Sequence, residues 1–78
     1  MRYAVIIEKG TENYGAYVPD LPGCVAVGDT VEEVMRLMRE AVDLHLEGMR
    51  EDKLPIPQPT SVCDYVDVEV EAVETTGV

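Results

Sequence analysis

The hydrophobic pattern changes its period at Thr30, and this change limits the fold more than any other feature of the sequence. Before Thr30, apolar residues fall in short runs of strand type between turn-forming residues. After Thr30 they recur about every 3.6 residues, which is the period of an α-helix. Thr30 and Glu33 have the spacing of a capping box, in which each side chain accepts a hydrogen bond from a backbone amide. We therefore predict strands first and one long helix afterwards.

Three strands are expected before the helix. "RYAVIIEK" has β-branched or aromatic residues at nearly every position, which is typical of a central strand covered on both faces. The polar stretch "GTEN" then predicts a hairpin turn into a second strand, "YGAYV". A third, short strand, "CVAV", is closed by Gly28 and Asp29.

The corner "PDLPG" between the second and third strands is rich in turn-forming residues. Pro19 ends a strand, and Pro22 presets the backbone dihedral of a turn. Gly23 supplies the positive φ that such a turn requires. We interpret this corner as mainly structural.

The helix is predicted to be amphipathic and to end near Asp52. The three prolines of "LPIPQP" cannot continue it, so this segment is a stiff return connection. The apolar face of the helix consists of Val31, Val34, Met35, Met38, Ala41, Val42, His45, Leu46 and Met49, with Leu37 and Leu44 at its border.

A last strand is predicted in "SVCDYVDVEVEAV". From Val66 onward the residues alternate between two sides, which predicts one core face and one acidic face. Residues 75–78 carry no pattern and are expected to fray, which leaves residues 1–74 as a single domain. The core side carries Val66, Val68 and Val70, and the other side carries Tyr65, Asp67, Glu69 and Glu71.

The order strand, strand, strand, helix, strand predicts an α+β fold, with one helix on one face of a mainly antiparallel sheet. The second face of this sheet has no cover. Either Tyr3 and Ile7 or Ala4 and Ile6 must point toward it, so apolar area stays exposed in a lone subunit. We expect a second subunit or another partner to cover it.

The charge balance favours a basic partner. The chain contains six Lys and Arg residues and 16 Asp and Glu residues, and the resulting net charge of -10 disfavours direct binding to nucleic acid. No run approaches the roughly twenty apolar residues of a membrane span, and no apolar leader is evident, so we expect a cytoplasmic protein without membrane contact. Cys24 and Cys63 have no metal-type spacing, and reduced filler is favoured over a disulfide.

A catalytic role is weakly supported. The carboxylates of Glu8, Asp20, Asp67 and Glu69 could in principle hold a divalent metal for nuclease chemistry, but nothing predicts that they converge. His45 lies on the apolar helix face without evident partners, which favours a half-buried helix residue. We expect no catalytic residue, metal site or cofactor.

The chain resembles the HicB antitoxin family over roughly residues 2–70. The resemblance implies a truncated ribonuclease H-like fold that lacks the nuclease's catalytic residues. It also implies that the chain neutralises a HicA-type toxin, a small basic protein that cleaves RNA. The matching motif, in order and spacing, is Pro19, Asp20, Leu21, Pro22, Gly23, Cys24, Gly28, Thr30 and Glu33, between the strand "YAVIIEK" and the helix.

Four carboxylates are the candidate partner-binding residues. Asp67, Glu69 and Glu71 form an acidic row that would speed encounter with a basic toxin, although such charges also serve to keep a surface soluble. Asp20 belongs to the corner that the resemblance places near the toxin. Only eight residues follow Val70, so we expect a short form without the C-terminal DNA-binding segment of many relatives. The alternative is a solitary HicB-like scaffold that self-associates as a dimer or tetramer without a toxin.

Overall fold

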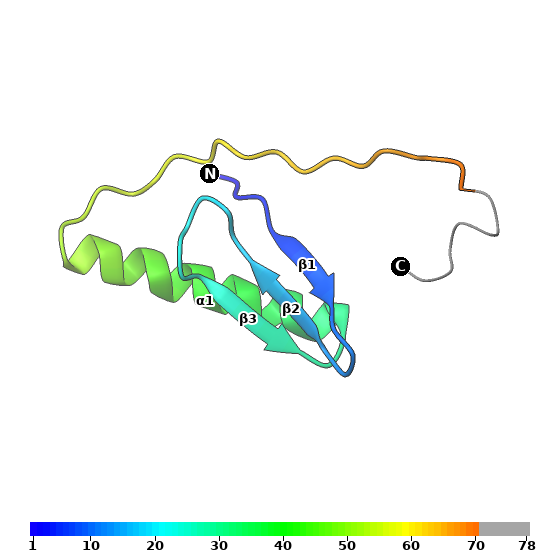
Figure 1. Ribbon diagram of the computed structural model, residues 1–78. Coiled ribbons are helices and arrows are strands. Elements are labelled where there is room, and N and C mark those ends of the chain that lie inside the picture. Colours follow the sequence, from blue (N-terminus) through cyan, green and yellow to red (C-terminus); the bar gives the residue numbers. More distant parts are fainter. Residues whose placement is uncertain (71–78) are drawn as a thin grey trace.

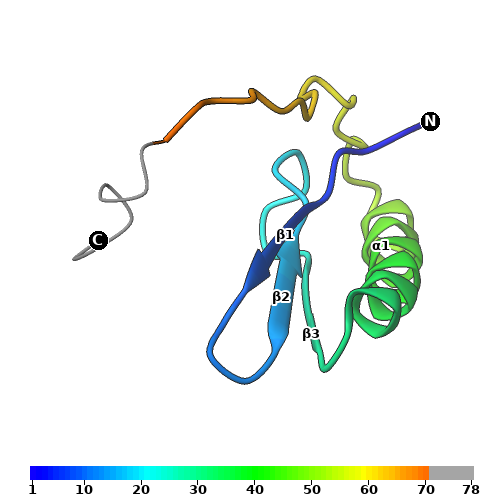
Figure 2. The same cartoon turned by 90° about the vertical axis from the view of Figure 1, so that its right-hand side faces the viewer.

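The computed structural model describes residues 1–70 of the chain. Strands β1 (Ile6–Lys9), β2 (Tyr14–Tyr17) and β3 (Val25–Gly28) precede helix α1 (Val31–Glu51). The strands form one antiparallel sheet in the order β1-β2-β3, and α1 covers one of its faces (Figures 1 and 2). The predicted α+β class is confirmed, with one helix on one face of an antiparallel sheet.

The strand register decides which side chains meet the helix. Ile7 pairs with Ala16, and Ala16 pairs with Ala26, so all three point to the helix side. The neighbouring row of Ile6, Tyr17 and Val25 points the opposite way. We call that side, with Val27, the outer face of the sheet. The core on the helix side consists of Ala16, Val18, Leu21, Cys24, Val34 and Met38.

The outer face is uncovered, as the sequence predicts. Tyr17, Val25 and Val27 are 40%, 62% and 59% exposed. Of the two registers expected for the first strand, the one that turns Ile6 outward is present, because Tyr3 and Ile7 pack against the core.

The helix begins at the predicted capping box. The amide of Glu33 donates to Oγ1 of Thr30 at 3.0 Å, and Oε1 of Glu33 accepts from the amide of Asp29 at 2.7 Å. The two side chains thus satisfy one amide inside the first turn and one just before it. Gly28 permits this tight entry, since a Cβ there would lie 2.9 Å from the backbone nitrogen of Val34.

The helix ends at Glu51 with Asp52 as its C-cap, close to the predicted end near Asp52, in a Schellman arrangement. The amide of Leu54 donates to the carbonyl of Met49 at 2.9 Å, and that of Lys53 donates to the carbonyl of Arg50 at 3.1 Å. Lys53 adopts a φ of 58°, in the left-handed region that favours glycine.

Two sequence predictions about the sheet are wrong for the described residues. The strand predicted over 61–73 is not formed in residues 61–70, and its last three residues lie outside the described part. Val66, Val68 and Val70, expected in the core, are 85%, 73% and 57% exposed. A strand exists only where its backbone groups find a ladder partner, and this segment diverges from the sheet (Figure 1).

Within residues 1–70 the first strand is correspondingly an edge strand rather than a central one, because none of the described strands pairs with β1 on the side away from β2. We call the chain after the helix, residues 53–70, the return segment. It runs past the N-terminus and then away from β1 in both views (Figures 1 and 2).

Replacing Gly28 with alanine is expected to destabilise the fold by about 1–3 kcal/mol, the usual cost of overpacking, because its Cβ would press on the helix backbone. Urea unfolding followed by circular dichroism measures this change. Gly15→Ala is the matched control, since a Cβ at Gly15 meets nothing within 4 Å. Equal midpoints for the two variants would contradict the close approach at Gly28.

Replacing Lys53 with glycine is expected to raise the free energy of unfolding by about 1 kcal/mol, because glycine adopts the left-handed conformation without the Cβ penalty. Thermal unfolding provides the measurement. Glu51→Gly, placed within the helix, should lower stability instead. A loss of stability in Lys53→Gly would refute this account of the helix end.

Candidate functional site

The carboxylate of Asp20 binds the return segment through four hydrogen bonds. Its Oδ2 accepts from the amides of Thr60 and Ser61, each at 2.9 Å. Its Oδ1 accepts from the hydroxyls of the same two residues, each at 3.0 Å. We call this group the Asp20 clamp. It joins the corner after β2 to a point 40 residues further along the chain.

The corner is built so that this carboxylate faces the return segment. The amide of Leu21 donates to the carbonyl of Val18 at 3.1 Å, and the amide of Cys24 donates to the carbonyl of Leu21 at 3.0 Å. Gly23 has a φ of 84°, the positive value expected from the sequence. Leu21 is fully buried, which anchors the corner in the core. Pro19 and Pro22 remain exposed at its surface.

The hydrogen bonds lower the pKa of the Asp20 carboxyl below its ordinary value. The amide of Ser61 has the largest effect, partly opposed by desolvation, and the amide and hydroxyl of Thr60 and the hydroxyl of Ser61 add to it. The charged carboxylate is therefore the form that holds the segment. By contrast, burial raises the pKa of the Cys24 thiol, as befits a reduced core residue.

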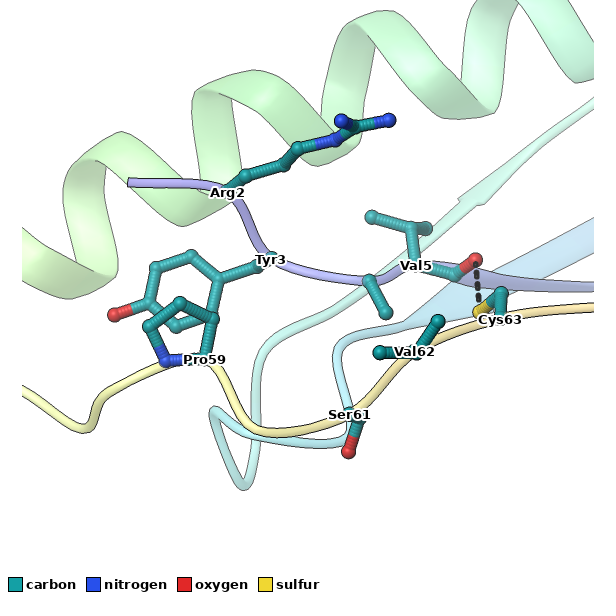
Figure 3. A pocket seen from close by; sticks show the side chains of 8 residues that line it. Arg2, Tyr3, Val5, Pro59, Ser61, Val62 and Cys63 are labelled. Atoms are coloured by element: carbon teal, nitrogen blue, oxygen red, sulfur yellow. Dashed lines mark hydrogen bonds between the residues drawn. The ribbon is translucent and has the colours of Figure 1, made fainter.

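A cavity of about 520 Å³ separates the N-terminal residues from the return segment (Figure 3). The hydroxyl of Tyr3 donates to the carbonyl of Pro57 on one side of it. On the other side, the Cys63 thiol donates to the carbonyl of Val5 over 3.9 Å, a weak contact. The segment therefore follows the N-terminal residues in parallel without forming a ladder with them.

The predicted partner-binding residues lie along this one segment or at its anchor. Asp67 and Glu69 are exposed on the return segment, and Glu71 lies outside the described residues. Asp20 holds the segment at Thr60 and Ser61, so its carboxylate is already engaged within the chain. The role of these carboxylates in partner binding stays a prediction.

Within residues 1–70, no group of three or more His, Cys, Asp or Glu side chains is arranged to hold a metal ion. Glu8, Asp20, Asp67 and Glu69 are therefore not gathered into a site there. His45 is half-buried on α1, as expected. None of the described helices is both long and apolar enough to cross a bilayer.

The sequence pattern of one protein family, described as "HicB_like antitoxin of bacterial toxin-antitoxin system", matches residues 3–74. The chain belongs to this HicB-like antitoxin family. Antitoxins are not enzymes, so the expectation that the chain is not an enzyme is confirmed.

Named relatives include both antitoxins and proteins without an assigned role. Antitoxin HicB 1 of Photorhabdus laumondii is 39% identical over 71 residues, which are 87% of this chain and 45% of that protein. A protein of Haemophilus phage HP1, described as an uncharacterized protein of 14.9 kDa, is 40% identical over 67 residues, 86% of this chain and 50% of its own length. This HicB-like chain thus spans about half the length of both. The UPF0150 protein of Thermotoga maritima is 33% identical over 75 residues, 94% of this chain and 91% of that protein.

A solved structure has the same fold. A chain of the structure titled "HicA3 and HicB3 toxin-antitoxin complex" matches with a TM-score of 0.66 and 30% identity, over 76% of this HicB-like chain and 70% of that chain.

Thr60 and Ser61 are hydrogen-bonding partners of Asp20 that the sequence does not reveal. Hydroxyl residues after prolines carry no local signal for a contact 40 residues away. Asp20 itself is identified by the motif, because it stands between two turn-forming prolines.

Replacing Asp20 with asparagine is expected to loosen the return segment, because one acceptor oxygen is exchanged for an amide that donates. Hydrogen exchange at the Thr60 and Ser61 amides should accelerate. In the wild type, the lowered pKa means that the clamp contributes stability above the ordinary carboxyl pKa of about 3.9 and loses it as the pH falls through the lower folded value. Glu47→Gln, which neutralises an exposed helix carboxylate, is the control. Unchanged exchange in Asp20→Asn would rule out the clamp.

Proposed function

We propose that the protein binds and neutralises a small basic RNA-cleaving protein of the HicA type. The observation that carries this proposal is the match to a chain of a toxin–antitoxin complex, at 30% identity and a TM-score of 0.66. Family membership over residues 3–74 supports it. Neutralisation by such a chain requires only that it cover the toxin's RNA-binding surface and repel RNA from it.

The electrostatics of the chain suit that role. A net charge of -10 on 78 residues attracts a basic protein and repels the phosphates of its RNA substrate. The exposed carboxylates of Asp67 and Glu69 stand on a segment whose start is fixed by the Asp20 clamp. Tethering reduces the conformational entropy that the segment loses on binding.

A second function remains open, namely a HicB-like scaffold that self-associates without a toxin. The exposed outer face favours it, because Tyr17, Val25 and Val27 have no cover within the described chain. Self-association as a dimer or tetramer is also compatible with the antitoxin role.

Purification of the tagged protein from its native host at low salt distinguishes the two. The antitoxin proposal expects a small basic companion, identified by mass spectrometry, which cleaves RNA alone and is silent when this chain is added back. Light scattering that shows only a homo-oligomer, with no companion from cells grown under several stresses, would instead support the scaffold.

Charge reversal at Asp67 and Glu69, each to lysine, is expected to slow association with the toxin about tenfold or more at low salt, because electrostatic steering is lost. Stopped-flow mixing at several salt concentrations measures the rate. The double variant Glu47→Lys, Glu51→Lys changes the net charge equally on exposed helix positions and should slow association less. Equal rates for the two double variants would remove the acidic row from the mechanism.

A further inference from the structure

We propose that residues 62–70 add as a fourth strand to the free edge of β1 in a second copy of this chain. The exchange is reciprocal, so a twofold dimer contains two such strands. The same segment carries Asp67 and Glu69 of the proposed toxin contact, but the test of the dimer needs no toxin.

Residues 62–70 have the pattern of a strand but no strand partner. From Val66 onward apolar and acidic side chains alternate, and every residue of the segment is exposed. Val62, Val66 and Val68 are 89%, 85% and 73% exposed, and leaving this apolar surface in water is unfavourable. Among the described residues, the hydrogen bonds of the segment beyond Ser61 are the weak one from the Cys63 thiol to the Val5 carbonyl and one from the amide of Tyr65 to the adjacent Asp64.

The outer edge of β1 likewise lacks a pairing partner among the described residues. Its sequence is typical of a central strand, yet in the described part of the chain the sheet order leaves it unpaired on one side. Nine extended residues reach roughly 30 Å, whereas the four residues of β1 need only about 13 Å, so the segment is long enough to cover this edge.

Charge favours an acidic strand at this edge. Exposed Arg2 and Lys9 stand before and at the end of β1, and they are two of only six cations in the chain. Neither forms an ion pair with another described residue, where Arg36–Glu40 is the one pair present. The carboxylates of Asp67 and Glu69 attract these two cations, although the carboxylate of Glu8 in β1 repels the two carboxylates. A basic strand from a toxin would instead be repelled by the two cations.

The geometry points to a second copy rather than to the segment's own sheet. A cavity of about 310 Å³, lined by Val5, Ile6, Ile7 and residues 62–65, separates the segment from its own β1. The Asp20 clamp fixes the start of the segment, and toward residue 70 the segment runs away from β1 (Figure 1). A strand that is anchored at one end and directed away from its own domain is placed to reach another one.

Light scattering and sedimentation of the intact protein test the proposal. The wild type should have the mass of two chains, and Val68→Pro should have the mass of one, because proline removes an amide needed for the added ladder. Val66→Lys, which removes the apolar side instead, should do the same. Val27→Lys on the outer face is the control and should leave the dimer intact. Unchanged far-ultraviolet circular dichroism confirms that each variant is folded.

Cross-linking then separates exchange from closure within one chain. Two chains with tags of different size are mixed, one carrying Glu8→Cys and the other Val68→Cys, and are treated with a short bismaleimide. Both chains also carry Cys63→Ser, and Cys24 is protected from the reagent because it is buried. A product that contains both tags is expected. The proposal is overturned by a monomeric wild type, by a dimer that survives Val68→Pro and Val66→Lys, or by a Glu8→Cys, Val68→Cys chain that links only to itself.

Discussion

The hydrogen bonds that the Asp20 carboxylate accepts from Thr60 and Ser61 fix the position of the return segment, residues 53–70, against the rest of the fold. The described core joins the sheet to one face of α1, and it contains no residue beyond Met38 that is fully buried. The prolines of the return segment make it stiff, but stiffness does not fix its direction. The clamp supplies that direction, because it ties two consecutive residues by both backbone and side chain to a corner whose Leu21 is fully buried.

Local physics explains why part of this fold is predictable from sequence. The capping box at Thr30 and Glu33 and the positive φ of Gly23 depend on residues within a few positions of each other. The helix end at Asp52 is likewise predicted by the prolines that follow it. The corner residues identify the family for the same reason, since their spacing is set by one turn.

The sequence predictions fail where a structure depends on a pairing partner that is distant in the sequence. The alternation of Val66, Val68 and Val70 predicts a strand, but alternation cannot name the edge with which the strand pairs. The apolar sequence of β1 likewise predicts a central strand, whereas β1 lies at the edge of the sheet that residues 1–70 form. The two errors are related: among the described residues the predicted last strand has no edge to pair with, and the edge of β1 has no strand to pair with it. The contact of Asp20 with Thr60 and Ser61 is long-range and polar, so no periodic pattern in the sequence predicts it.

Self-association and toxin binding make different demands on one segment, and strand geometry reconciles them. Successive residues of a strand project to opposite sides, so pairing engages the backbone while Val66 and Val68 pack on one side and Asp67 and Glu69 stay on the other. Two copies that each carry a charge of -10 repel one another, and this repulsion weakens as salt screens it. Attraction to a basic protein weakens under the same screening. Rising salt should therefore strengthen the dimer while it weakens the toxin complex, because screening removes a repulsion in the first case and an attraction in the second.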